Sequence, residues 1–390
     1  LFNGMEYMEH RKLRMGMVGG GEGAFIGNVH RMAANLDGQI ELVCGAFSSN
    51  ADKAKRSGEA LFLPADRCYA SYAEMFKAEQ ARDADSRMDF VAIVTPNHLH
   101  FDVAKMAMEH GFHVICDKPA TFTLAEANEL AAVIAKHERL FGLTHTYTGY
   151  PMVKQARDEV QKGTLGKIVK VVAQYNQGWL AASADTNNKQ ATWRLDPTQA
   201  GVSCCMGDIG VHAANLMEYV TGHNITEICA DLHSVVSGRT LDDDGTVLAK
   251  LDNGATGIVT ASQICIGNEN NLTISVYGEE AGLSWRQEEP NTLLLKYNDQ
   301  PTQIIRTSVG ELSHESTLAT RTPAGHPEGY LEAFANLYVR FTEQIRAFPE
   351  APKGLEPIPG VEEAIRGMAF IENAVSASQS DVKWHPFKTK

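Results

Sequence analysis

Short apolar runs alternate with amphipathic segments through the first third of the chain. The apolar runs have strand length, and the segments between them carry apolar residues at helical spacing. Strands are predicted at 15–18, 40–47, 90–95, 113–116 and 141–145, and helices at 27–36, 52–58, 71–78, 100–110 and 124–137. Strands that alternate with helices favour a parallel sheet covered on both faces. We therefore expect a doubly wound α/β domain of the Rossmann type over residues 12–150.

From residue 167 the pattern changes to longer runs in which apolar and polar residues alternate, at 167–176, 227–236, 246–251, 255–265, 271–277 and 292–297. Turn signals such as Asp252-Asn253-Gly254 separate these runs and favour one open, mostly antiparallel sheet. Helices are predicted at 328–348 and 361–378, and we expect them to pack back toward the first domain. The second domain, residues 151–390, is then α+β, with helices on one face of the sheet. The other face needs a cover, which predicts a homodimer or homotetramer.

Composition and charge narrow the class of protein. The chain has 390 residues, 44% of them hydrophobic, and a formal net charge of −13. This charge repels phosphate backbones, so nucleic acid is not an expected partner. No apolar run reaches the roughly 18 residues of a membrane span, and residues 1–14 lack the apolar core of a signal peptide, so we expect no membrane association and a cytoplasmic protein. The seven cysteines form no Cys-x-x-Cys pair, which predicts reduced thiols and no zinc site.

A glycine-rich segment joins the first predicted strand to the first predicted helix. Glycine permits positive φ and close approach of a ligand, and the N–H groups that begin a helix can hold a pyrophosphate. From Gly21 the glycines follow the pattern Gly-x-Gly-x-x-x-Gly, which is looser than the usual fingerprint. Residues 22–25 are then expected either to bulge outward or to wrap the pyrophosphate. A bound dinucleotide is the first hypothesis, and a surface loop is the alternative. The candidate contacts are Gly19, Gly21, Gly23, Phe25, Ile26 and Gly27.

Two further predicted strands end in polar residues. Open α/β sheets bind ligands at the carboxyl ends of their strands, so a lysine that emerges there can meet a nicotinamide ring. Lys118 is that lysine, and a solvated loop lysine is the alternative. The candidate cofactor contacts at these two strand ends are Thr95, Pro96, Asn97, His100, Asp117 and Lys118.

Asp208 and His212 form the second candidate group. In a helix they would be i and i+4 on one face, and a carboxylate beside an imidazole raises the pKa of the imidazole and orients it as a general base. A helix-start aspartate with a core histidine is one alternative. A metal pair is another, although no third ligand is suggested nearby.

Taken in order, four motifs resemble the Gfo/Idh/MocA oxidoreductases. They are the glycine turn with Gly27-x-x-His30, Thr95-Pro96-Asn97-x-x-His100, Asp117-Lys118-Pro119, and Gly207-Asp208-x-x-x-His212. The resemblance covers nearly the whole chain and implies an NAD(P)-dependent dehydrogenase that acts on a hydroxyl group of a sugar, sugar derivative or cyclitol. It also implies a catalytic trio of Lys118, Asp208 and His212, and a cis peptide before Pro119.

The chain departs from the family pattern in ways that affect ligand choice. Asp117 stands where the family has glutamate. The acidic residue common after the second strand is replaced by Ser48 and Ser49. With Lys53 and Arg56 nearby, this replacement permits NADP as well as NAD. The stretch 145–150 also differs, so a different substrate pocket is expected. Indole faces and a guanidinium suit sugar recognition, and core packing is the alternative. The candidate substrate contacts are Lys118, Tyr147, Trp179, Trp193, Arg194, Asp208 and His212.

Two other functions remain open at this point. A sensor or regulatory protein would bind NAD(P) without turning over a substrate, but the retained Lys118, Asp208 and His212 argue against it. A metal-dependent lyase or hydrolase that uses Asp208 and His212 would lose activity with a chelator.

Overall fold

The computed structural model describes residues 11–182 and 189–390, and these form two compact units. The N-terminal unit contains residues 11–144 and 334–364, and the C-terminal unit contains residues 145–333 and 365–390. The predicted division after residue 150 differs from this one, because Tyr147 and Tyr150 belong to the hydrophobic core of the C-terminal unit. Residues 334–364 return to the N-terminal unit.

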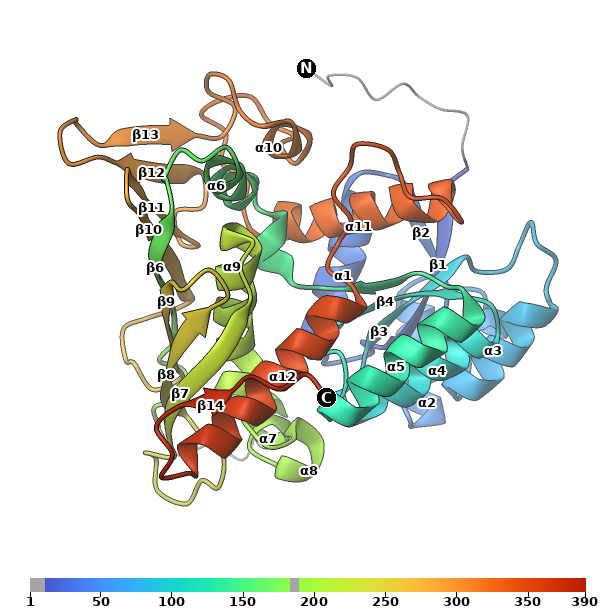
Figure 1. The fold of residues 1–390 in the computed structure, drawn as a ribbon. Helices are drawn as coiled ribbons and strands as arrows, with labels where there is room; N and C mark the ends of the chain where they lie inside the picture. Colours follow the sequence, from blue (N-terminus) through green and yellow to red (C-terminus); the bar gives the residue numbers. More distant parts are fainter. Residues whose placement is uncertain (1–10, 183–188) are drawn as a thin grey trace. The chain divides into compact units, whose positions relative to one another are not determined.

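The N-terminal unit is built on a five-stranded parallel sheet in the order β2-β1-β3-β4-β5 (Figure 1). The strands are β1 (Leu13–Gly19), β2 (Ile40–Ala46), β3 (Phe90–Val94), β4 (His113–Cys116) and β5 (Phe141–Leu143). This is a doubly wound order, and the strand order reverses between β1 and β3. Ligands bind at such a switch point, outside the carboxyl ends of the strands.

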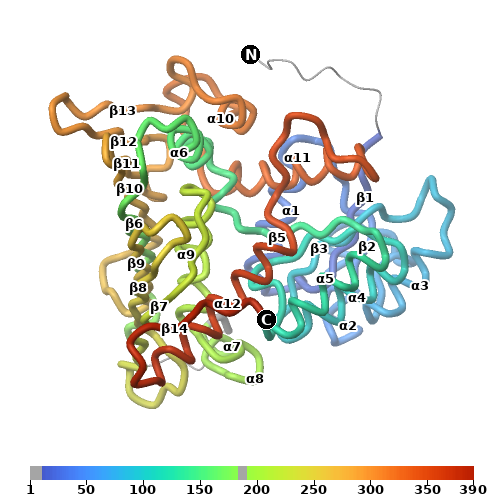
Figure 2. The backbone as a smooth tube through the Cα atoms, in the orientation of Figure 1, coloured from blue at the N-terminus to red at the C-terminus, as the bar shows by residue number. Residues whose placement is uncertain are grey.

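Helices cover both faces of this sheet, as the uninterrupted burial of β3 requires. Val91 and Ile93 of β3 share a core cluster with residues of α3, α4 and α5, whereas the ring of Phe90 packs edge-on against Phe341 of α11. The helices of this unit are α1 (Phe25–Leu36), α2 (Ala51–Ala60), α3 (Tyr72–Ala81), α4 (His100–Glu109), α5 (Leu124–His137) and most of α11 (Tyr330–Ala347). Figure 2 traces the short β5 at the edge of the sheet.

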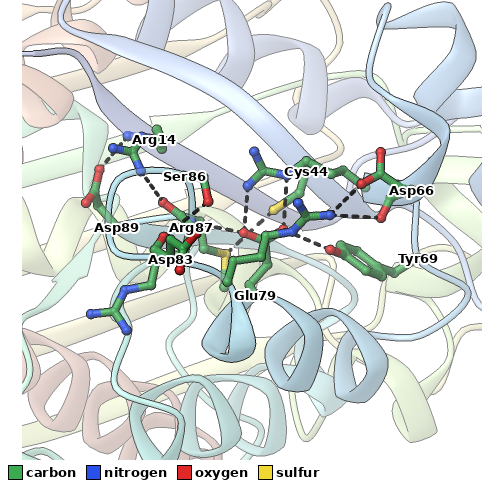
Figure 3. A network of polar contacts seen from close by, with 12 residues as sticks. Arg14, Cys44, Asp66, Tyr69, Glu79, Asp83, Ser86, Arg87 and Asp89 are labelled. Carbon is green, nitrogen blue, oxygen red and sulfur yellow. Dashed lines mark hydrogen bonds and ion pairs between the residues drawn. The ribbon is translucent and has the colours of Figure 1, made fainter.

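A buried carboxylate ties the segment between α2 and α3 to the rest of the N-terminal unit (Figure 3). Glu79 of α3 is fully buried and accepts two hydrogen bonds from Arg67, at 3.0 and 2.6 Å. The Tyr69 hydroxyl donates to it at 2.8 Å, and the backbone N–H of Met88 donates at 3.0 Å. A buried charge is tolerated where it is paired and hydrogen-bonded in this way.

The C-terminal unit is built on a nine-stranded sheet in the order β13-β12-β11-β10-β6-β9-β8-β7-β14. Only β6 and β9 pair in parallel; the other neighbouring strands are antiparallel. The strands are β6 (Ile168–Asn176), β7 (Ile225–His233), β8 (Asp244–Leu251), β9 (Thr256–Ser262), β10 (Asn271–Gly278), β11 (Gly282–Arg286), β12 (Thr292–Lys296), β13 (Gln303–Arg306) and β14 (His385–Pro386).

Helices of the C-terminal unit pack on one face of this sheet, α9 against β6, β9 and β10, and α6 against β11 and β12 (Figure 1). The side chains on that face alternate with half-buried or exposed ones on the other, as in Val247 and Leu248 of β8. The helices are α6 (Pro151–Gln161), α7 (Lys189–Arg194), α8 (Pro197–Ala200), α9 (Val211–Thr221), α10 (His314–Leu318) and most of α12 (Val361–Ser378).

The structure confirms the predicted fold class, a parallel doubly wound sheet followed by an open, mostly antiparallel sheet with helices. It adds elements that the sequence pattern did not predict: α6, α7, α8, α10, β11, β13 and β14. Most of these are shorter than six residues or lie in turn-rich sequence, where periodicity carries little signal.

Candidate active site

The glycine turn after β1 is shaped by three residues with positive φ, Gly19, Gly20 and Gly23. Gly20 and Gly27 meet so closely that a Cβ on Gly27 would lie 2.4 Å from the Cα of Gly20. Gly27 therefore brings α1 against the end of β1, which is the role of the third glycine in a dinucleotide fingerprint. The longer spacing is absorbed by a tight turn, in which the N–H of Ala24 donates to the carbonyl of Gly21 at 3.0 Å.

The start of α1 suits an anionic group. Its N-cap, Ala24, makes no side-chain hydrogen bond, and the first turn holds no acidic residue, so the opening N–H groups of the helix have no side-chain acceptor from the cap. Phe25 is mostly exposed, and Ile26 is half-buried. The turn and the helix start therefore fit a pyrophosphate.

Ser48 and Ser49 follow β2, at the carboxyl edge of the sheet. Ser48 Oγ accepts a hydrogen bond from the N–H of Asn50 at 3.2 Å, and Ser49 is exposed. Asn50 then caps α2 by accepting from the N–H of Lys53 at 2.9 Å. The segment is thus a helix-start turn without a carboxylate at the position after the strand.

The segments after β3 and β4 are joined by one buried imidazole. The Nδ1 atom of His100 lies 2.7 Å from the carbonyl oxygen of Pro119, and its Nε2 atom lies 2.8 Å from the carbonyl oxygen of Thr95. Pro96 begins the short turn Asn97–Leu99, and Asn97 is buried. Lys118 is half-buried immediately after β4, and the Lys118–Pro119 peptide is cis, as the resemblance implied. His100 therefore fixes the backbone on the carboxyl side of Lys118.

Asp117 is held by groups from other elements of the N-terminal unit. The Thr144 hydroxyl donates to its Oδ1 atom at 2.8 Å, and His30 Nε2 lies 3.8 Å from the same oxygen. His30 is fully buried, and its Nδ1 atom lies 2.7 Å from the hydroxyl of Tyr338. Burial alone would raise the pKa of Asp117, but His30, the Lys118 ammonium group and the Thr144 hydroxyl outweigh it and hold that pKa below its ordinary value. Asp117 is therefore an ionised neighbour of Lys118.

In the C-terminal unit, Asp208 lies in a π-helical turn, Met206–Gly210, that runs directly into α9. The spacing of Asp208 and His212 was considered for a regular helix, but here the N–H of Val211 bonds to the carbonyl of Met206, five residues back. The carboxylate of Asp242 holds the start of this segment by accepting from the N–H groups of Cys204 and Met206, at 2.9 and 2.8 Å. Turns of this kind occur frequently at functional sites.

Asp208 is bound by an arginine and an amide. Arg194 Nε and Gln263 Nε2 each donate to its Oδ2 atom at 2.9 Å. The guanidinium carbon of Arg194 lies 4.4 Å from the ring centre of Trp193 and 5.9 Å from that of Trp179. The structure therefore brings four predicted residues together: Asp208, Arg194 and the two indoles.

His212 lies in the first turn of α9 among aromatic rings. Its imidazole packs edge-on against Tyr147, with ring centres 4.8 Å apart, and against His145, at 5.6 Å. The hydroxyl groups of Tyr147 and Tyr175 lie 2.5 Å apart. Burial raises the pKa of Tyr147 well above its ordinary value, with further contributions from Tyr175 and from the charge of Asp208. Tyr147 therefore stays protonated, as a hydrogen-bond donor.

Tyr175, Gln177 and Asn270 were not among the candidate residues of the sequence, and they connect Tyr147 with Trp179 through hydrogen bonds. The Tyr175 hydroxyl donates to Asn270 Oδ1 at 3.2 Å, and Gln177 Nε2 donates to the same atom at 2.8 Å. Trp179 Nε1 then donates to Gln177 Oε1 at 2.8 Å. In the sequence, only the alternation of apolar and polar residues along 167–176 pointed to Tyr175, because it placed this residue on the buried face of a strand.

Within residues 11–182 and 189–390, no three histidine, cysteine, aspartate or glutamate side chains are grouped so that they could hold a metal ion. No helix of the described chain has the length and apolarity that crossing a bilayer requires.

A doubly wound sheet with a glycine turn at its switch point defines a dinucleotide-binding protein. The chain belongs to the Gfo/Idh/MocA oxidoreductases: residues 13–145 match the family's NAD-binding Rossmann fold, and residues 153–284 match its C-terminal domain. It is thus an NAD(P)-dependent dehydrogenase.

Similar proteins support this assignment over the whole length. The uncharacterised oxidoreductase YfiI of Bacillus subtilis is 33% identical and covers 100% of both chains. An oxidoreductase structure from Sinorhizobium meliloti is 40% identical with a TM-score of 0.87, and covers 96% of this chain and 100% of its own. An inositol dehydrogenase homolog from Azotobacter vinelandii complexed with NAD+ is 34% identical with a TM-score of 0.92, and covers 97% and 98%. A second structure of that homolog contains NADH and myo-inositol.

Proposed function

We propose that this chain oxidises a secondary hydroxyl group of a cyclitol, sugar or sugar derivative, or reduces the corresponding ketone, with NAD or NADP. The observation that carries the proposal is the cluster of Asp208, Arg194, Trp179 and Trp193, because it offers charged hydrogen-bonding groups beside exposed indole surface. Rings with many hydroxyl groups bind to such surfaces. The complex of the Azotobacter vinelandii homolog with myo-inositol supports the same substrate class.

Three residues carry the proposed chemistry. His212 accepts the proton of the substrate hydroxyl, Lys118 stabilises the developing alkoxide or relays its proton, and Asp208 orients the imidazole or the ammonium group. The nicotinamide of the bound cofactor supplies the hydride acceptor. His100 keeps the backbone at Lys118 in place through its bridge between Thr95 and Pro119.

Cofactor contacts are proposed along the carboxyl edge of the first sheet. Gly19 and Gly23 give the turn its positive φ angles, and Gly21 fits closely against the residue after β2. The residues proposed to hold the dinucleotide are Gly19, Gly21, Gly23, Phe25, Ile26, Gly27, Ser48, Ser49, Thr95, Pro96, Asn97, His100, Asp117 and Lys118. This set fits the group because it places backbone N–H donors and hydroxyl groups at the switch point of the sheet.

We also infer that the second face of the nine-stranded sheet is the interface through which the chain forms a homodimer or homotetramer. Leu248, Ile258 and Val172 lie abreast on β8, β9 and β6, and all three point away from the core. Leu248 is 39% exposed. An apolar stripe across a broad sheet face is typical of a surface covered by another copy.

A panel of cyclitols and sugars, assayed with NAD and with NADP by reduced-nicotinamide absorbance, tests the proposal. We expect turnover of at least one cyclic polyol that a metal chelator leaves unchanged. Cofactor binding without any turnover would favour the regulatory alternative, and loss of turnover with chelator would favour a metal-dependent enzyme.

A further inference from the structure

The glycine turn carries an acidic side chain to the edge of the sheet where β2 ends. The N–H of Gly21 donates to the carbonyl of Phe47, the residue after β2, at 3.2 Å. A Cβ on Gly21 would lie 2.7 Å from that carbonyl oxygen, so the two segments are in direct contact. Glu22 is the next residue of the turn, and it therefore sits over the end of β2.

Glu22 is bound to α2 through its backbone, and its side chain lies beside that helix. Its N–H donates to Ser57 Oγ at 3.0 Å, and that hydroxyl in turn donates to the carbonyl of Lys53 at 2.7 Å. Its carboxylate lies 3.5 Å from Arg56. Gly23, with a φ of 76°, then turns the chain away toward α1. The carboxylate thus lies beside one cation of α2, Arg56, at the surface.

In a doubly wound fold, the adenosine ribose lies at the end of the second strand, next to the glycine turn. An acidic residue there accepts from the ribose 2′-hydroxyl, whereas an arginine there accommodates a 2′-phosphate. In this chain Ser48 and Ser49 follow β2, so that position holds no carboxylate. Glu22 lies in the turn that contacts Phe47 at the end of β2, and its carboxylate lies beside Arg56.

We propose that Glu22 makes this dehydrogenase select NAD over NADP, both by repelling a 2′-phosphate and by engaging Arg56. The proposal rests on the proposed function only in its use of a nicotinamide dinucleotide. It assigns to the glycine turn the selection that an acidic residue after β2 performs in the usual fingerprint.

Calorimetric titration of NAD+ and of NADP+ tests this without any substrate, so a failure to find turnover leaves the test intact. Wild type is expected to bind NAD+ more tightly. Glu22→Gln is expected to tighten NADP+ about tenfold relative to NAD+, the size of one unit charge acting across several ångströms of partly exposed protein. The gain should shrink as salt rises, because exposed charges are screened.

Two further variants give the controls. Asp52→Asn removes a carboxylate from the first turn of α2 and keeps Glu22, so it is expected to leave the ratio of the two affinities near the wild-type value. Glu22→Gln combined with Arg56→Gln should lose most of the NADP+ gain, because the cation that Glu22 engages is gone. Equal affinity of wild type for the two cofactors, or an equal effect of Glu22→Gln and Asp52→Asn, would overturn the proposal.

Discussion

Replacing Glu79 with glutamine tests whether the buried network of Figure 3 holds the N-terminal unit together. Glutamine keeps the size of the side chain and removes the charge. Arg67, whose side chain is only 11% exposed, then loses its partner, and the new amide group faces donors from Arg67, Tyr69 and Met88. Breaking a buried ion pair on one side costs about 3–5 kcal/mol, and leaving donors unsatisfied contributes to that sum.

Urea unfolding followed by two signals measures the effect. All four tryptophans, Trp179, Trp193, Trp285 and Trp384, belong to the C-terminal unit, so their fluorescence reports on that unit, whereas far-ultraviolet circular dichroism reports on both. We expect Glu79→Gln to lower the free energy of unfolding by about 3–5 kcal/mol in the dichroism transition, and to shift the fluorescence transition less.

The matched control is Glu129→Gln, which removes a carboxylate from an exposed pair with Lys105 at 3.0 Å. Exposed pairs contribute about 0–1 kcal/mol, so this variant should unfold nearly as wild type does. If the two variants differ from wild type by the same small amount, the reasoning about the buried charge is refuted.

Two other predictions concern pH and assembly. Burial and the charge of Arg139 lower the pKa of His113 to about 4. Between pH ~4 and ~6.5, the pKa of a histidine in the unfolded chain, the unfolded chain therefore binds a proton that the folded chain does not. The free energy of unfolding falls as pH falls through this window, by at most about 3 kcal/mol. Melting temperatures across that window should fall less steeply in His113→Gln than in wild type, and parallel curves would contradict the assignment. Ile258→Lys places a charge on the outward face of the nine-stranded sheet and should shift sedimentation to a smaller species. Val382→Lys changes an exposed residue outside that face and should leave sedimentation unchanged. A monomeric wild type would contradict the proposed assembly.

The sequence predicted the N-terminal sheet well, because each of its strands is a short apolar run whose neighbours are helices. The bounds of β4 and α5, and of the late helix α12, were predicted to the residue. In the C-terminal unit the long alternating strands were predicted, but the four-residue β13 was not. A strand of that length shows too few alternations to stand out from its loops.

The candidate site was predictable only where local sequence determines it. The glycine turn and the end of β4 follow from neighbouring residues, and so do the two positions Asp208 and His212. Their surroundings do not, because Gln263 meets Asp208 from 55 residues away and Tyr338 meets His30 from 308 residues away. The π turn at Met206–Gly210 also escaped prediction, since an inserted residue within a helix leaves the periodicity of a short segment nearly unchanged.

The rate of a single hydride transfer in Lys118→Ala and in His212→Ala tests the central claim most directly. With a polyol that wild type oxidises and with saturating cofactor, each variant is predicted to reduce the nicotinamide at least about a hundredfold more slowly, the usual size of a lost acid–base group. His212→Ala should bind the cofactor with little change in affinity, because His212 is outside the proposed set of cofactor contacts. Lys105→Ala and His223→Ala remove the same side-chain types from exposed ion pairs and should transfer hydride at the wild-type rate. Wild-type transfer rates in the Lys118 and His212 variants would contradict the assignment of this chain's catalytic residues.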